Sequence, residues 1–314
     1  MAERQRPPHD RGSKLWNPSG GPSRLLISSF DRWTSALLAD DGVDMPFMGG
    51  AEMIEAKIFS RGEGVLVGCA AVDHMLQIWA GSLDISWSCT DGRSIASGDE
   101  IAIIRGDKEA ILALERTILN ILGQLSGIAT EAKKWSTKAP GQIACTRKTI
   151  WGLLDKWAVH LGGGLSHRLS RNDAKMIKEN DLAAMYPELD TNGARIGRLI
   201  SEIDVDEVGA FLEIEVRKEK EAIMAAFAWS EKRMTTGCGR LVLMLDNFGP
   251  ERCSAVCSEL DEMGLREHVC IEASGGIVLN DLEDWRKCGI DVISTSTINR
   301  GTTPLDLSMI ANDA

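Results

Sequence analysis

Polar side chains follow six short apolar runs in the second half of the chain, at the point where each run ends. The runs are "QIACT", "AKMIK", "AFLEIEV", "RLVLMLD", "HVCIEAS" and "DVISTS". The groups at or just beyond their carboxyl ends are Arg147 and Lys148, Lys178, Glu215, Asp246, the turn Ser274, Gly275 and Gly276, and Ser296. In α/β barrels the catalytic groups lie at the carboxyl ends of the strands. We therefore expect these residues to share one rim.

These residues offer three kinds of chemistry. Arginine binds carboxylate or phosphate through two hydrogen bonds and lysine acts as a point charge, which suits a substrate with several anionic groups. Glu215 and Asp246 are hard oxygen donors of the kind that hold Mg²⁺, and the glycine and serine turns can direct amides and hydroxyls at a phosphate. The cationic candidates are Arg147, Lys148, Arg168 and Lys178, with His167 beside them. Together the three sets predict a site for a phosphorylated sugar with a pyrophosphate leaving group.

The elements that must position these groups alternate between strand and helix. Helical segments are expected over residues 151–161, 219–231, 250–263 and 280–287. Strands that alternate with helices form a parallel sheet, which is either doubly wound or closed as a barrel. The run "WSEKRMTTGCGR", before the fourth strand, is expected to lengthen a helix or a loop away from the site.

The first half of the chain has a different pattern. Residues 1–23 are rich in Pro, Gly, Arg and Ser without apolar periodicity, which predicts a mobile tail. A helix is expected over 25–40, followed by the strand-like runs "AEMIEAKIFS", "EGVLVGCAAV", "LDISWSC" and "DEIAIIRG". These elements predict a small sheet domain with one helix or more across it, over about 25–106.

A long helix is expected next, over "DKEAILALERTILNILGQLSGIATEAKKW". Its core stripe recurs at helical spacing and consists of Ile111, Leu114, Ile118, Leu122, Leu125 and Ala129. Another face carries polar and very small residues, namely Arg116, Asn120, Gly123 and Gly127. Small residues allow another backbone to approach closely, so this face is expected to meet a partner chain or a ligand.

The bulk properties restrict the class of protein. The chain has 314 residues, 44% of them hydrophobic, and a formal net charge of -11. This charge argues against a general nucleic-acid binder, which needs a broad basic surface. No apolar stretch has the length of a membrane span and the polar start lacks a signal-peptide core, so we expect a cytoplasmic protein. The eight cysteines form no C-x-x-C pair and are expected to be reduced, mostly buried thiols.

Eight motifs occur in the order, and nearly the wording, of the quinolinate phosphoribosyltransferase family, the carboxylating nicotinate-nucleotide pyrophosphorylases. They are "ERTILNILGQLSGIAT", "TRKT", "KWAVHLGGGLSHRL", "DAKMIKEN", "EIEV", "LMLDNF", "EASGGI" and "GIDVISTSTI". The chain resembles this family over about residues 30–312.

The resemblance implies a type II phosphoribosyltransferase of the α/β class, with an incomplete α/β barrel and a smaller N-terminal α/β sandwich domain. The expected division is a disordered tail over 1–23, the sandwich domain with its linking long helix over 24–130, and the barrel over 131–314. The family assembles as a homodimer or a higher even homo-oligomer with shared active sites. The small domain of one subunit then covers the barrel mouth of the other, and Arg116 reaches the neighbour's site.

By motif, the resemblance assigns a role to each rim residue. The pyridine acid would be bound by Arg116, Arg147 and Arg168, with His167 and Lys148 beside them. The phosphoribosyl donor would contact Lys148 and Lys178, its Mg²⁺ would be held by Glu215 and Asp246, and its 5-phosphate by Ser274, Gly275, Gly276 and Ser296. The implied reaction converts quinolinate and phosphoribosyl pyrophosphate to nicotinate mononucleotide, pyrophosphate and CO₂ in NAD biosynthesis. Lys148, Lys178, Glu215 and Asp246 are the expected catalytic residues.

Several substitutions depart from the family's motifs. Cys145 replaces an acid, and a proline and an arginine are absent from the stretch Ile150 to Leu154. Asp181 stands where a histidine is expected, and Ser296 replaces a glycine that permits close phosphate approach. We expect Cys145 to be a buried strand thiol rather than a nucleophile, because no motif supplies it with a base. Glu213 shares a side of its strand with Glu215 and is expected to support it.

Two other functions stay open on the sequence. One is a paralogous phosphoribosyltransferase that acts on nicotinate or another planar acid. The other is a phosphate-binding protein without turnover. The presence of Lys178 favours the quinolinate branch, and the complete set of Lys148, Lys178, Glu215 and Asp246 argues against lost turnover.

Overall fold

The computed structural model describes residues 6–313, which form two compact units. The first unit, here called the barrel unit, contains residues 6–11, 137–147 and 165–296, and the second contains 12–136, 148–164 and 297–313. The chain therefore passes between the units several times, whereas the sequence predicted one boundary near residue 130. Residues 1–5 of the predicted tail lie outside the described residues.

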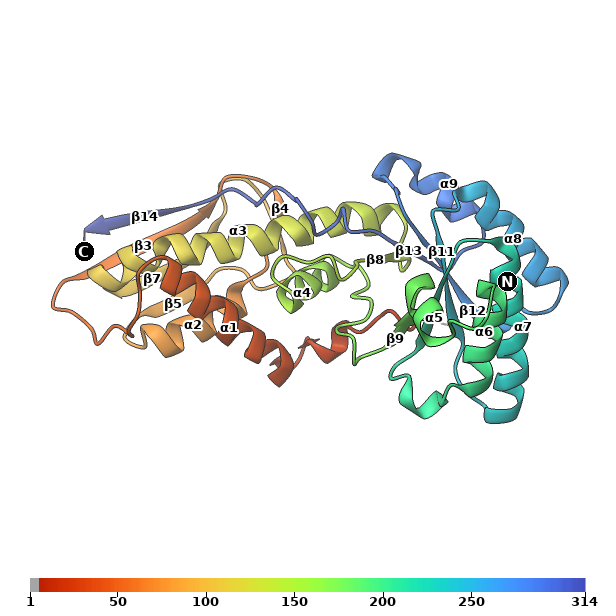
Figure 1. The fold of residues 1–314 in the computed structure, drawn as a ribbon. Helices are drawn as coiled ribbons and strands as arrows, with labels where there is room; N and C mark the ends of the chain where they lie inside the picture. The colour runs from red at the N-terminus through yellow and green to blue at the C-terminus, as the bar shows by residue number, and fades with distance from the viewer. Residues whose placement is uncertain (1–5, 314) are drawn as a thin grey trace. The chain divides into compact units, whose positions relative to one another are not determined.

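The barrel unit is built on a six-stranded parallel sheet (Figure 1). Its strands are β8 (Ile143–Ala144), β9 (Lys175–Ile177), β10 (Leu212–Val216), β11 (Leu241–Asp246), β12 (Val269–Ser274) and β13 (Val292–Ser294). Their spatial order is β8-β13-β12-β11-β10-β9, so the first strand in sequence lies beside the last. This is the order of an α/β barrel with one gap, between β8 and β9. It confirms the predicted α/β class, and each of the six predicted runs contains a strand.

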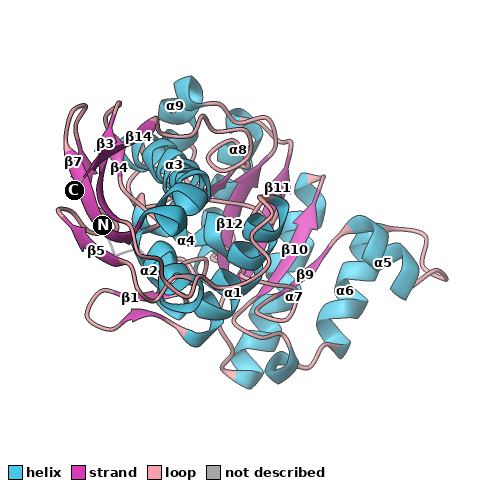
Figure 2. Ribbon diagram, turned by 90° about the vertical axis from the view of Figure 1, so that its left-hand side faces the viewer, coloured by secondary structure: helices cyan, strands magenta, loops and turns pink. Residues whose placement is uncertain are grey.

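Helices follow most of these strands and surround the sheet (Figure 2). They are α5 (Glu179–Met185), α6 (Asn192–Glu202), α7 (Glu219–Thr236), α8 (Pro250–Glu262) and α9 (Leu282–Lys287). The run "WSEKRMTTGCGR" extends α7, which ends at Gly237 in the left-handed conformation. Lys232 Nζ in this extension donates to Ile200 O at 2.7 Å. Residues 229–236 of the run are thus helical, and residues 237–240 form the loop before β11.

The second unit contains a four-stranded antiparallel sheet in the order β14-β3-β7-β5. Its strands are β3 (Met53–Ser60), β5 (Asp84–Trp87), β7 (Glu100–Asp107) and β14 (Leu307–Asp313), with the short pairs β1 (Trp16–Asn17) and β2 (Gly21–Pro22), and β4 (Gly64–Val65) and β6 (Ser94–Ile95). Its helices are α1 (Arg24–Asp40), α2 (Cys69–Trp79), α3 (Lys108–Lys138) and α4 (Leu153–Leu161). Three features differ from the prediction: "EGVLVGCAAV" turns into α2 after β4, and both α4 and β14 belong to this unit instead of the barrel.

The long helix α3 is buried along its predicted stripe, with all six stripe residues at 0% exposure. The small-residue face, however, is covered by this chain itself. Leu305 N donates to Gly123 O at 2.9 Å, and a Cβ at Gly127 would lie 2.3 Å from Thr303 O. The expectation of a partner or a ligand is therefore wrong for the two glycines, since a returning segment of the same chain fills their space.

The N-terminal segment also differs from its prediction. Over residues 6–23 the structure has a 3-10 helix (Gly12–Lys14) and the pair β1 and β2 in place of a mobile tail. The reason is that single side chains fix this segment without any apolar periodicity, and His9 is fully buried in the barrel unit. Among residues 6–313 no helix combines the length and apolar character that crossing a membrane requires.

Candidate active site

Two carboxylates lie at the ends of neighbouring strands, as predicted. Glu215 is in β10 and pairs in register with Met244 of β11, the strand that Asp246 ends. One guanidinium reaches both carboxylates, because Arg217 Nε lies 3.5 Å from Asp246 Oδ2 and Arg217 Nη2 lies 3.9 Å from Glu215 Oε1. Lys178, directly after β9, forms an ion pair with Glu215. The two carboxylates are thus close enough to share a single cation, and their oxygens are of the kind that bind Mg²⁺.

The turn after β12 has the geometry of a close-approach loop. Gly275 has φ +103°, and a Cβ there would lie 2.2 Å from Asn247 Oδ1, so only glycine fits. Gly276 also has a positive φ, of +62°. Asn247 N donates to Ser274 O at 2.9 Å, which joins this turn to the one that follows Asp246. Ser296 is half-buried two residues after β13.

The two predicted substrate-binding arginines of the barrel unit, Arg147 and Arg168, differ in burial. Arg147 is exposed after β8, whereas only 8% of Arg168 is exposed. Arg168 Nη1 donates to Ala174 O at 3.1 Å, and its buried Nε has no hydrogen-bond partner among residues 6–313. Burial lowers the pKa of Arg168, an effect opposed by Glu213 and reinforced by the positive charge of Arg147. The guanidinium is thus held in place by Ala174 O and Met176 Sδ.

Two predicted residues belong to the second unit. Arg116 is exposed on α3, where its nearest acidic neighbour is Glu115 at 3.9 Å. Lys148 is exposed, and its backbone oxygen accepts a hydrogen bond from Asn299 Nδ2 at 2.9 Å. Both residues have the exposure that contact with a substrate requires.

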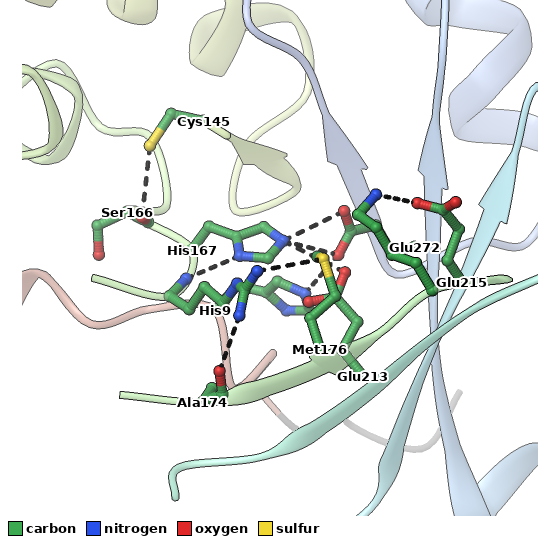
Figure 3. Close-up of polar contacts among 11 residues, drawn as sticks. His9, Cys145, Ser166, His167, Ala174, Met176, Glu213, Glu215 and Glu272 are labelled. Carbon is green, nitrogen blue, oxygen red and sulfur yellow. Dashed lines mark hydrogen bonds and ion pairs between the residues drawn. The ribbon is translucent and has the colours of Figure 1, made fainter. Parts of the chain in front are cut away.

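His167 lies in the barrel interior instead of among the exposed cations of the rim. Its side chain is 3% exposed and its ring points towards Glu272 (Figure 3). His167 Nε2 lies 3.2 Å from Glu272 Oε2 and 3.6 Å from Glu213 Oε1. His9 Nε2 is 2.7 Å from the same Glu272 oxygen. We call His9, His167, Glu213 and Glu272 the buried cluster.

The two glutamates of the buried cluster have opposite pKa shifts. Burial raises the pKa of Glu213, and the negative charge of Glu272 adds to the effect. Burial also opposes ionisation of Glu272, but the charge of His167 and hydrogen bonds from both histidines outweigh it and lower the pKa. Burial likewise disfavours the charged His167 ring, yet Glu272 and Glu213 raise its pKa to about 10. Glu272 is therefore the carboxyl group of the pair that ionises more readily.

Sequence reasoning missed three residues at or beneath the site. Arg217 stands one position beyond β10, and a longer window after each strand would have included it. Glu272 is the first residue of the motif "EASGGI", and its place two residues before Ser274 on one side of β12 was the available signal. His9 has no signal, because its partner Glu272 is 263 residues away.

The departures from the family's motifs have local structural roles. Cys145 is fully buried and its Sγ donates to Ser166 O at 3.3 Å, which confirms the prediction of a buried thiol, although Cys145 directly follows β8 instead of lying in it. Asp181 Oδ2 accepts a hydrogen bond from Lys178 N at 2.9 Å, at the start of α5. Asp181 thus fixes the backbone of a predicted substrate-binding lysine.

The strand order and the rim define the class of protein, an α/β barrel with charged side chains suited to anionic ligands at the carboxyl ends of its strands. Residues 35–126 match the family model of the quinolinate phosphoribosyl transferase N-terminal domain, and residues 128–310 match that of the C-terminal domain. The chain therefore belongs to the quinolinate phosphoribosyltransferase family, as the motifs predicted.

Individual relatives support the same family. Proteins named "Probable nicotinate-nucleotide pyrophosphorylase (carboxylating)" are similar to this chain in Methanothermobacter thermautotrophicus, at 34% identity over 82% of this chain and 88% of the relative, and in Archaeoglobus fulgidus, at 35% over 82% and 93%. The solved structure of the nicotinate-nucleotide pyrophosphorylase from Francisella tularensis has a TM-score of 0.75 at 26% identity, covering 91% of this chain and 97% of that one.

Proposed function

We propose that this chain transfers the phosphoribosyl group of phosphoribosyl pyrophosphate to the nitrogen of quinolinate, with release of pyrophosphate and CO₂ and formation of nicotinate mononucleotide. The observation that carries the proposal is the match of both domains to one family of transferases, with the family's charged residues retained at the strand ends. We further propose that the reaction serves NAD biosynthesis in the cytoplasm.

Mg²⁺ is the proposed cofactor, and Glu215 and Asp246 would hold it. The contacts of Arg217 with both carboxylates support this fit, since they bring one positive charge within 4 Å of each. When bound, Mg²⁺ offsets the charge of the pyrophosphate leaving group. Arg217 has an exposed side chain, so it can leave the carboxylates at low cost.

The side chains of the barrel unit would act by positioning and electrostatics. Arg147 and Arg168 bind the carboxylates of the pyridine acid and orient its nitrogen towards the anomeric carbon. Lys178 has a half-exposed side chain that can turn from Glu215 to the phosphoribosyl donor. The turn at Ser274, Gly275 and Gly276 offers backbone amides to the 5-phosphate, together with Ser296. None of these roles needs a covalent intermediate with the protein.

The second unit would complete the site across a homodimer or a higher even oligomer. Arg116 supports this role because it is a largely exposed arginine with only a weak acidic neighbour in its own unit. Lys148 would contact both substrates from the loop that follows Arg147.

The test is to incubate the protein with phosphoribosyl pyrophosphate and Mg²⁺, and with either quinolinate or nicotinate as the acceptor. Mononucleotide formation from quinolinate alone is the expected result. Turnover of nicotinate alone would show that the chain is instead a paralogous phosphoribosyltransferase that acts on nicotinate. No turnover of either acid would favour a phosphate-binding protein.

A further inference from the structure

The N-terminal segment, residues 6–11, is bound inside the barrel unit although it lies outside both ranges that match the family. Those ranges begin at residue 35. The ring of His9 is fully buried and packs 5.2 Å from Phe211 and 4.9 Å from His167. Phe211 directly precedes β10, so His9 enters near the amino-terminal ends of the strands, opposite the rim. This segment therefore reaches the site from the amino-terminal end of the barrel strands.

A chain of polar contacts connects His9 to the backbone of Arg168. His9 Nε2 is 2.7 Å from Glu272 Oε2, and the same carboxylate accepts from His167 Nε2 at 3.2 Å. The other nitrogen of His167, Nδ1, lies 2.7 Å from the backbone nitrogen of Arg168. Figure 3 shows the contacts of His9 and His167 with Glu272, and the contact of His167 Nδ1 extends this chain to the backbone of Arg168.

Arg11 holds the same stretch of backbone from a second side. Its N–H donates to Ser166 Oγ at 3.1 Å, and its guanidinium binds Asp173 through Nη2 at 2.7 Å and Nε at 3.2 Å. Asp173 Oδ2 in turn accepts from Leu169 N at 2.9 Å. Residues 166–169 are thus tied to the N-terminal segment on both sides of Arg168.

The backbone at this point needs such support. His167 has φ +54°, a left-handed conformation that is uncommon for residues other than glycine. It persists only where the surrounding contacts enforce it. The His9–Glu272–His167 contacts supply that enforcement at the residue directly before Arg168.

We propose that His9 is a positioning residue for the phosphoribosyl transfer. It fixes Glu272 and His167, and through them it sets the position of the Arg168 guanidinium that grips the carboxylate of the substrate. The proposal rests on the proposed function. It adds to that function a requirement for the N-terminal segment, which acts from the end of the barrel opposite the rim.

A metal ion is the alternative occupant of this cluster, because ligand atoms of His9, His167 and Glu272 lie within 4.8 Å of one another. The proton on His167 Nε2 decides between the two. Nε2 is protonated in the charged ring, and it is also protonated in the neutral ring when Nδ1 accepts from Arg168 N. In both forms Nε2 donates to Glu272 and has no lone pair for a metal. The geometry therefore favours a network of hydrogen bonds.

The test compares His9→Leu, which removes the donor, with His9→Gln, whose amide can still donate to Glu272. Arg6→Gln is the matched control, because Arg6 is an exposed residue of the same segment. Two quantities are measured: hydrogen exchange of the amides of residues 166–169, and KM for each substrate with kcat. We expect His9→Leu to raise KM for quinolinate about tenfold, in line with part of one charge-assisted hydrogen bond. KM for phosphoribosyl pyrophosphate should stay nearly unchanged, and amide exchange at 166–169 should accelerate. His9→Gln and Arg6→Gln should resemble the wild type.

Three results would overturn the proposal. They are wild-type exchange and KM in His9→Leu, equal impairment of His9→Leu and His9→Gln, and a stoichiometric metal ion that the wild type retains and His9→Leu loses. If the wild type does not turn over quinolinate, the proposed function fails separately. Accelerated exchange in His9→Leu would then still show that His9 holds the backbone of residues 166–169, and unchanged exchange would contradict this.

Discussion

The rim and the buried cluster both pair basic with acidic side chains, but in opposite surroundings. At the rim, Lys178 has a half-exposed side chain and Arg217 is also exposed, whereas His9 and Glu272 below have no exposure. An exposed ion pair contributes little and exchanges partners easily. A buried charge without a partner costs several kcal/mol. Charged side chains at the rim can thus exchange their partners for substrate and Mg²⁺. Those in the buried cluster must stay paired with one another.

The largest expected effect belongs to a rim cation. Arg147→Ala should lower kcat/KM for quinolinate at least about a thousandfold, because a charged partner of the substrate's carboxylates is lost. Its free energy of unfolding should be nearly unchanged, since Arg147 is exposed. Steady-state kinetics and denaturant unfolding measure the two quantities. The nearby exposed Arg171→Ala is the control, and a loss of activity no greater in Arg147→Ala than in Arg171→Ala would contradict the assignment.

Two glutamate substitutions separate the rim from the cluster. Glu272→Gln should lower the free energy of unfolding by about 3 kcal/mol, because it leaves the buried histidines without their anion. Glu215→Gln should cost less stability than Glu272→Gln and should reduce activity instead, because the partners of the buried Glu215 carboxylate, Lys178 and Arg217, have half-exposed side chains that can turn to water. Urea denaturation of both variants checks the difference. Equal stability losses would show that the two carboxylates do not differ as described.

The sequence predicted the rim well because its information is local. The six strands have apolar runs of their own, and the residue at the end of a parallel strand must lie at one edge of the sheet. Glu215, Asp246 and Ser274 follow from that rule alone. The buried cluster could not be predicted in this way. His9 comes from a segment rich in proline and glycine, and its contact with Glu272 depends on tertiary structure.

The same limit explains the errors elsewhere. The strip of small residues on α3 correctly indicated that a backbone approaches closely, but local sequence does not say which backbone it is. His167 was assigned to the rim through its neighbour Arg168. The left-handed backbone of His167 turns its ring inward, which a motif does not show.

The cluster predicts a defined dependence of stability on pH. Glu272 has a lowered pKa in the folded state, so its contribution is complete above the ordinary glutamate value and is lost as the pH falls below it. His167 has a pKa raised to about 10, so its contribution is complete below about pH 6.5 and is lost as the pH rises towards 10. The denaturant midpoint should therefore fall as the pH drops below the ordinary glutamate value, and it should also fall as the pH rises from about 6.5 towards 10. In Glu272→Gln the free energy of unfolding should change less steeply with pH on both sides, by about 1 kcal/mol per pH unit, and unchanged slopes would contradict the account.

The smallest effect is expected at Cys145. Cys145→Ser should keep kcat/KM within about threefold of the wild type and lose about 1 kcal/mol of stability, since a hydroxyl can keep the hydrogen bond to Ser166 O. Kinetics and thermal unfolding together measure this. A folded but inactive serine variant would show that the thiol takes part in the chemistry.

The most direct measurement of the central claim uses quinolinate labelled at its 2-carboxylate. With phosphoribosyl pyrophosphate and Mg²⁺, the label should appear as CO₂ in a one-to-one ratio with mononucleotide. Neither product should form when phosphoribosyl pyrophosphate is omitted. Mononucleotide that forms without labelled CO₂, or CO₂ that forms without phosphoribosyl pyrophosphate, would contradict the proposed reaction.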